Sequence, residues 1–168
     1  MVKDGVVAVD LCNTVCNVNQ MLEDVLNVRR KTGEYRMKNL PENVFLKNPE
    51  LFLLPSVFDW AAESLQLISQ KYSIVYITAR PESARDVSKQ YLAKNGFPAG
   101  EVIFSARKVE VCKDMGNVVC AFEDEPDTIR SYIDAGIPVF SKMWDYNVNL
   151  GINFQWNNLY EVLLKVIP

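Results

Sequence analysis

Short apolar runs alternate along the chain with longer segments of helical periodicity. Apolar residues recur at helical spacing in five segments, at residues 58–72, 82–94, 108–115, 126–135 and 156–167. Continuous apolar runs typical of strands covered on both faces lie at residues 5–10, 73–78, 101–105, 118–122 and 137–140. This alternation predicts an α/β fold with a doubly wound, Rossmann-like parallel sheet of about five strands and flanking helices.

The stretch between the first strand and the next core helix is too long for a plain crossover loop. Its first part, residues 17–31, has helical periodicity, and we expect this helix to end at Gly33. The rest has no clear period. We expect a small, mainly helical cap over residues 17–55, inserted into a core of residues 1–16 and 56–168. An extra pair of helices packed beside the sheet is the alternative.

The composition is that of an ordinary globular protein of 168 residues, 49% hydrophobic and 23% charged. This length favours one domain with room for a modest insertion. The net charge is -3 and the basic residues are scattered, so no duplex nucleic acid partner is expected. No apolar run reaches the roughly 20 residues that span a bilayer, and the start, Met1-Val2-Lys3-Asp4, lacks the apolar core of a signal peptide. We therefore expect a cytoplasmic protein without a membrane partner.

The chain contains no histidine, which excludes the usual Ser-His-Asp and Cys-His nucleophile pairs. Its four cysteines form no C-x-x-C pair, and reduced thiols are the favoured interpretation; they are Cys12, Cys16, Cys112 and Cys120. Their spacing does not favour zinc. Any nucleophile must therefore act without imidazole.

Polar residues follow the predicted strands where each one ends. Asp10 follows the first strand, Thr78 the second, Lys108 lies just after the third, and Glu123-Asp124 follow the fourth. In a parallel sheet the carboxyl ends of the strands meet at one edge, where ligands bind. An acid, a hydroxyl, a lysine and an acid pair would then converge there. The alternative for Asp10 alone is that it only caps the next turn.

In this order the four groups resemble the motifs of the haloacid dehalogenase superfamily. Its members carry an Asp after the first strand, a Thr or Ser after the second, then a Lys, and an acidic pair after the fourth. Asn13-Thr14 and the run at residues 76–81 are most similar to the 5'(3')-deoxyribonucleotidase group and its bacterial and phage relatives. The resemblance covers nearly the whole chain.

The C-terminal part has a weaker resemblance to the same group. A Tyr-Asn pair, here Tyr146-Asn147, followed by a Trp and a terminal helix also occurs in the nucleotidase-like relatives. Trp144 and Trp156 are simplest to interpret as packing residues.

The resemblance implies a nucleophile and a magnesium site. Asp10 would attack phosphorus, since carboxylates form aspartyl-phosphate intermediates. Mg²⁺ takes oxygen ligands, and it would be bound by the carboxylates of Asp10 and Asp124 and the backbone carbonyl of Cys12. Glu123 would orient Lys108 or a metal-bound water rather than bind the metal.

The same resemblance implies a phosphate site. Thr78 and the neighbouring backbone amides, including that of Ala79, would hold a phosphate oxygen. Lys108 would place a positive charge near the phosphate oxygens and the acid pair, and it would take part in catalysis. Lys113 is the rival for this lysine, although Lys108 lies closer to its strand. Arg80 would contact phosphate or substrate; the alternative is a solvated arginine at a helix start.

Position 12 departs from the family pattern. Phosphatases of the superfamily carry a second Asp two residues after the nucleophile, as general acid and base, and this chain carries Cys12. A thiol is a poor replacement, and losing such a group typically costs about 10²–10⁴-fold in rate. Related branches without the second Asp include phosphonatases, dehalogenases and ATPases.

We therefore expect a magnesium-dependent phosphohydrolase, most like a 5'(3')-nucleotidase, that acts slowly on a small phosphorylated substrate such as a deoxynucleoside monophosphate. A catalytically impaired relative that binds a nucleotide, another phosphorylated ligand or a protein partner is the main alternative. A dehalogenase or phosphonatase is less favoured, because no cap lysine is distinguished by its context. The oligomeric state stays open.

Overall fold

A computed structural model of the chain describes residues 3–150 and 154–166. Its strands form one sheet in the order β3-β2-β1-β4-β5-β6, and each neighbouring pair runs parallel. The strands are β1 (Val6–Val9), β2 (Ser73–Thr78), β3 (Glu101–Phe104), β4 (Val118–Glu123), β5 (Val139–Lys142) and β6 (Gln155–Trp156). The strand order reverses between β1 and β4, which confirms the doubly wound parallel sheet. The sheet has six strands rather than about five.

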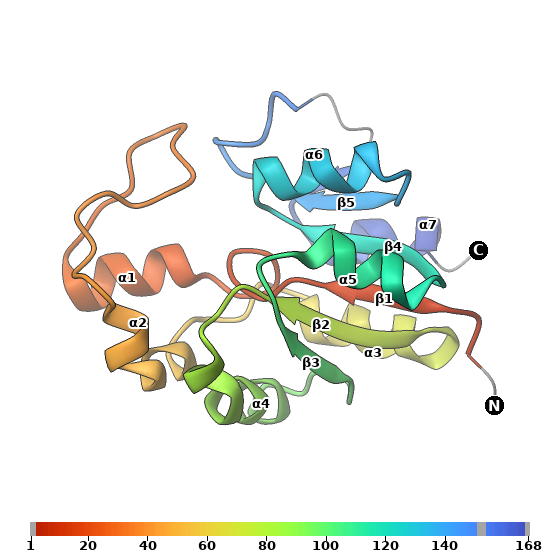
Figure 1. Cartoon of the computed structure of the whole chain (residues 1–168), viewed down its shortest axis with the longest axis horizontal. Helices are drawn as coiled ribbons and strands as arrows, with labels where there is room; N and C mark the ends of the chain where they lie inside the picture. Colours follow the sequence, from red (N-terminus) through yellow and green to blue (C-terminus); the bar gives the residue numbers. More distant parts are fainter. Residues whose placement is uncertain (1–2, 151–153, 167–168) are drawn as a thin grey trace.

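Helices cover both faces of this sheet (Figure 1). On one face α3 (Ala61–Lys71), α4 (Arg85–Lys94) and α7 (Leu163–Val166) contribute to one apolar cluster, and on the other α5 (Lys108–Met115) and α6 (Pro126–Asp134) contribute to a second. The described residues also form three 3₁₀ turns: η1 (Pro49–Leu53), η2 (Glu82–Ala84) and η3 (Leu159–Val162).

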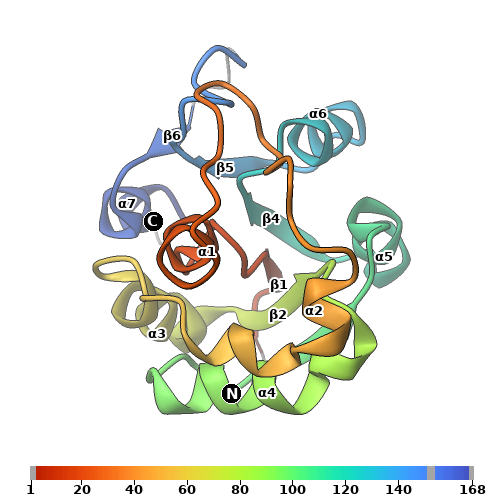
Figure 2. The same cartoon turned by 90° about the vertical axis from the view of Figure 1, so that its left-hand side faces the viewer.

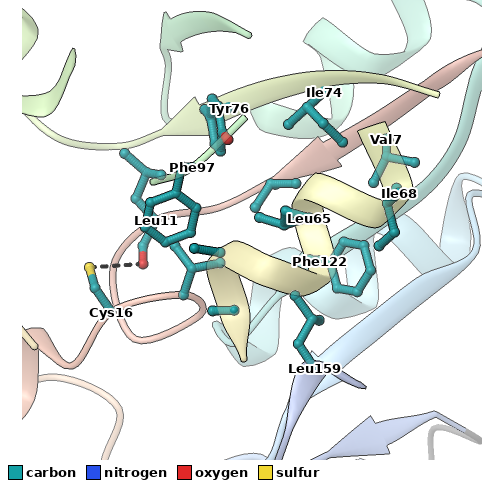
Figure 3. Packing of buried hydrophobic residues seen from close by; sticks show 14 of the residues in the cluster. Val7, Leu11, Cys16, Leu65, Ile68, Ile74, Tyr76, Phe97, Phe122 and Leu159 are labelled. Carbon is teal, nitrogen blue, oxygen red and sulfur yellow. Dashed lines mark hydrogen bonds between the residues drawn. The ribbon is translucent and has the colours of Figure 1, made fainter. Parts of the chain in front are cut away.

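The central strand β1 contributes to both clusters because successive side chains of a strand point to opposite faces. Val7 and Val9 lie in the cluster with α3, and Ala8 lies in the cluster with α5 and α6. Figure 3 shows Val7 close to Ile68 and Leu65 of α3. Fully burying a side chain of this kind stabilises the fold by roughly 1.5–3 kcal/mol. The packed core therefore holds the carboxyl end of β1 in a fixed place.

The segment between β1 and α3 is less helical than expected. Its helix α1 (Val18–Leu26) ends at Asn27, which has a left-handed conformation with φ of 51°, so the expected extension to Gly33 is wrong. Asn tolerates this conformation better than most residues do. The chain is then irregular until the short helix α2 (Val44–Lys47). Figures 1 and 2 show α1, α2 and the connecting loop beyond the carboxyl ends of the strands.

The C-terminal part also departs from expectation. Trp156 was predicted to begin a helix, and instead it pairs with Lys142 as part of β6. The side chain of Asn158 then accepts a hydrogen bond from the backbone N–H of Tyr160, at 2.9 Å, and the helical turns begin there. The end of the predicted helix, Ile167, lies outside the described residues.

Candidate active site

The carboxyl ends of β1 and β4 bring three acidic residues together. Asp10 directly follows β1, Glu123 ends β4 and Asp124 follows it, and these two strands are neighbours. The backbone N–H of Asp10 donates to the carbonyl of Phe122 at 3.0 Å, which continues the ladder to the strand end. One carboxylate oxygen from each of Asp10, Glu123 and Asp124 lies within 4.8 Å of the others.

Lys108 is the lysine that reaches this cluster. It is the first residue of α5, and its Nζ donates to Asp10 Oδ1 at 2.6 Å and to Glu123 Oε2 at 2.8 Å. Burial lowers the pKa of Lys108, but the two carboxylates outweigh burial and raise that pKa above its ordinary value. Lys113 lies in the last turn of α5, is exposed, and forms no ion pair with another described residue.

Glu123 has few free acceptor positions. Its Oε2 accepts from Lys108, and its Oε1 accepts from the backbone N–H groups of Asp124 and Glu125 at 3.0 and 3.1 Å. These contacts orient Glu123 and leave Asp10 and Asp124 as the better metal ligands.

Three polar residues that the sequence analysis did not assign to the cluster hold it in place. The Thr14 hydroxyl lies 3.0 Å from Asp10 Oδ2 and 2.8 Å from Asp124 Oδ1, and the Tyr146 hydroxyl donates to Asp124 Oδ2 at 2.6 Å. Asn147 donates to the backbone carbonyl of Asp124 at 2.8 Å. The sequence signals that could have identified these residues are the Asn13-Thr14 and Tyr146-Asn147 pairs, which belong to the family resemblance.

The cluster carries more negative than positive charge. When all groups are ionised, three carboxylates face one ammonium, and each of the four residues is buried. Burial, together with the charges of Asp10 and Glu123, raises the pKa of Asp124 well above its ordinary value. Burial also raises the pKa of Glu123 to about 7, although Lys108 opposes this. A divalent cation would balance the excess of two negative charges.

The oxygen atoms present fit magnesium. Mg²⁺ prefers carboxylate and carbonyl oxygens and is commonly held by one or two carboxylates plus substrate phosphate and water. In the described part of the chain, the backbone carbonyl of Cys12 accepts no hydrogen bond, so it is free to act as a ligand beside Asp10 and Asp124.

The raised pKa values predict how stability depends on pH. Between pH 4.5 and about 7, folded Glu123 binds more protons than the unfolded chain does, and Asp124 shifts in the same direction. The contribution of this cluster to stability is therefore greatest at low pH and is lost as pH rises through about 7. Mg²⁺ binds the ionised carboxylates and should reverse this loss.

Thermal unfolding between pH 4.5 and 8, in EDTA and in Mg²⁺, measures this effect. We expect the stabilisation by Mg²⁺ to grow with pH. If the unfolding temperatures in Mg²⁺ and in EDTA differ by the same amount at every pH, the cluster does not bind the metal.

Tyr146 provides a second test of the metal site. The Tyr146→Phe variant loses the hydroxyl that orients Asp124, and removing such an outer-shell contact typically weakens metal binding by about 10-fold or more. Calorimetric titration with Mg²⁺ or Mn²⁺ measures the affinity, and Tyr160→Phe is the matched control because Tyr160 is 59% exposed. Equal affinities of Tyr146→Phe and the native protein would remove Tyr146 from the site.

A cavity of about 380 Å³ opens beside the cluster. The core contributes Asp10, Cys12 and Lys108 to its wall, and the predicted phosphate residues Thr78, Ala79 and Arg80 also line it. The segment between β1 and α3 contributes six apolar side chains, Val18, Leu22, Met37, Leu40, Phe45 and Phe52, and also Asn13, Asn19, Tyr35 and Arg36. Phe45 and Phe52 stack with their ring centroids 4.6 Å apart.

Arg80 is buried, with 5% of its surface exposed, so the alternative of a solvated arginine is wrong. Its Nε donates to Cys12 Sγ at 3.2 Å, and its Nη1 donates to Ser88 Oγ at 3.0 Å. The guanidinium also lies 4.2 Å from the ring centroid of Phe52. No described carboxylate forms an ion pair with Arg80, although the nearby charge of Asp10 is among the causes that raise the pKa of its guanidinium.

Known proteins resemble this chain in sequence or in fold. A curated protein of Bacillus cereus named "Putative nucleotidase" is 31% identical over 118 residues, which are 66% of this chain and 62% of that protein. The chain therefore spans less than two thirds of that relative's length. A solved haloacid dehalogenase-like family hydrolase from Streptococcus pneumoniae has a TM-score of 0.63 at 13% identity, covering 96% of this chain and 97% of its own.

A haloacid dehalogenase-superfamily hydrolase of subfamily IA from Geobacter sulfurreducens has a TM-score of 0.62 at 13% identity and is covered over 98% of each chain. No family model matches the chain. In residues 3–150 and 154–166, no helix has the length and apolar character needed to cross a membrane.

The strand order, the acidic cluster after β1 and β4, and these similarities define the class. The chain has the haloacid dehalogenase-like fold, which confirms the resemblance found in its motifs. The Bacillus cereus protein that resembles the chain in sequence carries the name of a nucleotidase.

Proposed function

We propose that the protein is a magnesium-dependent phosphomonoester hydrolase of the haloacid dehalogenase type, with Asp10 as nucleophile. One observation carries the proposal: the buried Asp10 carboxylate is held by Lys108, lies beside Asp124, and lines a cavity large enough for a small phosphorylated molecule. Residues 17–55 act as a cap over this cavity.

In the proposed reaction, an Asp10 oxygen attacks the phosphorus of the substrate, the ester P–O bond breaks, and the leaving oxygen takes up a proton and departs as an alcohol. Water then hydrolyses the aspartyl phosphate to inorganic phosphate and free Asp10. Lys108 Nζ holds Asp10 and Glu123 in place and offsets negative charge on the phosphate oxygens. When bound to Asp10, Asp124 and the Cys12 carbonyl, Mg²⁺ supplies further charge neutralisation. Thr78 and the backbone amide of Ala79, which line the same cavity, hold a phosphate oxygen.

A nucleoside monophosphate is the proposed substrate. The cap side of the cavity is mainly apolar and carries the stacked Phe45–Phe52 pair, and a planar base gains stability by packing on such a surface. The Bacillus cereus relative, by its name, supports the same substrate class.

The test is phosphate release from a panel of ribonucleoside and deoxyribonucleoside monophosphates, in Mg²⁺ and in EDTA. We expect release in Mg²⁺ only, and faster release from nucleotides than from glycerol phosphate, which has no base. Equal rates in EDTA, or no preference for nucleotides, would overturn the metal or the substrate assignment respectively.

Cys12 limits the proposed reaction. Burial raises the pKa of its thiol, with Arg80 opposing, so the thiol is a weak acid and is not ionised to serve as a base at neutral pH. Cys12→Asp would place a carboxylate in the cavity wall beside Arg80, at the position where phosphatases of the superfamily carry their general acid and base. We expect phosphate release from nucleotides to rise by about 10-fold or more.

Phosphate release from a nucleoside monophosphate and from an aryl phosphate measures the gain for Cys12→Asp. An aryl leaving group needs no proton, so the gain should be smaller on that substrate. Cys12→Asn is the control, because asparagine has the same shape as aspartate but lacks its acid-base function. A Cys12→Asp variant no faster than the native protein would show that another group already supplies the proton.

Cys12 also favours a second candidate function, namely binding of a phosphorylated ligand without turnover. Mg²⁺-dependent binding of a nucleoside monophosphate, measured by calorimetry in a protein that releases no phosphate, would support this candidate instead.

A further inference from the structure

Cys12 and Cys16 face each other across the loop after β1. The backbone N–H of Cys16 donates to the carbonyl of Leu11 at 3.2 Å, and its carbonyl accepts from the N–H of Asn13 at 2.7 Å. Cys16 is therefore hydrogen-bonded to both neighbours of Cys12, as a residue in one parallel strand is to its partner. Adjacent strands lie about 4.8 Å apart. A disulfide requires Cα atoms roughly 4.4–6.8 Å apart.

The two sulfur atoms also point toward the same group. Arg80 Nε donates to Cys12 Sγ at 3.2 Å, and Arg80 Nη2 donates to Cys16 Sγ at 3.6 Å. These nitrogens belong to one planar guanidinium, so both thiols lie beside one small group. Backbone pairing and side-chain direction thus both favour a bond between the two sulfurs.

We propose that Cys12 and Cys16 form a reversible intramolecular disulfide when the protein meets a peroxide. The Cys12 sulfur attacks one peroxide oxygen, the O–O bond breaks, and Cys12 becomes a sulfenic acid as the first water leaves. The Cys16 sulfur then attacks the Cys12 sulfur, the S–S bond forms, the S–O bond breaks, and the hydroxyl leaves with the Cys16 proton as the second water. Two thiols and one hydrogen peroxide give one disulfide and two waters.

The surroundings assign the order of the two steps. Cys12 is half-buried and lines the cavity, so a small oxidant reaches it, whereas Cys16 has no exposed surface. Burial raises the pKa of both thiols, that of Cys16 to about 12, and in each case the Arg80 guanidinium opposes this by stabilising the thiolate. The Cys16 thiol is held in place by a hydrogen bond to the Leu11 carbonyl at 3.3 Å, drawn in Figure 3.

The disulfide would act on the proposed active site. Both thiols leave their contacts with Arg80, and the loop that carries the Cys12 carbonyl becomes covalently closed two residues after Asp10. A reversible loss of phosphatase activity follows. This consequence rests on the proposed function, whereas formation of the disulfide does not.

The experiment treats the whole protein with hydrogen peroxide and follows its mass with and without dithiothreitol. We expect a loss of two hydrogens, reversed by the reductant and located in the tryptic peptide of residues 4–29, which contains both cysteines. The Cys16→Ala variant should stop at a Cys12 sulfenic acid that dimedone traps. A Cys112→Ala, Cys120→Ala variant should form the same disulfide as the native protein.

Three outcomes would overturn the proposal. In the first, the peptide of residues 4–29 still has two free thiols after oxidation. In the second, the disulfide joins two chains. In the third, the Cys16→Ala variant gives no dimedone adduct at Cys12. Phosphate release is measured on the same samples. A disulfide in a protein without phosphatase activity would support this inference and count against the proposed function alone.

Discussion

Replacing Asp10 by Asn is expected to abolish phosphate release while leaving the fold at least as stable. An amide does not attack phosphorus, and loss of a nucleophile that acts together with its partners costs at least about 1,000-fold in rate. The same change removes one of three clustered carboxylates and leaves the ion pair of Lys108 with Glu123 intact. Mutual repulsion in the cluster therefore falls.

Phosphate release and thermal unfolding in EDTA and in Mg²⁺ test both parts of this prediction. We expect a melting temperature in EDTA equal to or above that of the native protein, and a smaller gain from Mg²⁺. Asp127→Asn is the matched control, because the Asp127 side chain is 89% exposed and lies outside the cluster. An active Asp10→Asn variant would rule out Asp10 as the nucleophile.

Replacing Lys108 by Met should have the opposite effect on the fold. The methionine keeps much of the side-chain volume but removes the cation between Asp10 and Glu123, all of which are buried. Breaking a buried ion pair by removing one partner typically costs about 3–5 kcal/mol. We expect a loss of this size in EDTA, partly recovered in Mg²⁺ and at low pH, where the carboxylates are neutralised.

Urea unfolding measures this loss, and Lys113→Met is its control. Lys113 lies on the same helix but is exposed, so its replacement should change the free energy of unfolding by no more than about 0.5 kcal/mol. Equal effects of the two substitutions would contradict the assignment of Lys108 to the cluster.

The sheet was predictable because its central strands are buried on both faces and therefore read as continuous apolar runs. The acid, hydroxyl and lysine that follow these runs were predictable for a related reason, since parallel strands end at one edge. β6 was not predictable, because Gln155 and Trp156 are too few to show a period. The early end of α1 at Asn27 was also hidden, since Val28 extends the apolar pattern by one residue past it.

The contacts that support the site could not be predicted from the sequence pattern. Tyr146 and Thr14 reach Asp124 from loops far apart in the chain, and loops have no periodicity from which to infer direction. The burial of Arg80 depends on packing against Phe52 and on Ser88, and neither contact follows from spacing.

The central place of β1 also constrains how the chain folds during synthesis. β1 is made first, yet it pairs with β2, which ends at Thr78, and with β4, which ends at Glu123. At translation rates of about 5–20 residues per second, its second partner follows roughly 5–25 s later. Until then one edge of a highly apolar strand has no partner. β1 is therefore the strand that most needs protection, by the ribosome or a chaperone, from pairing with another strand.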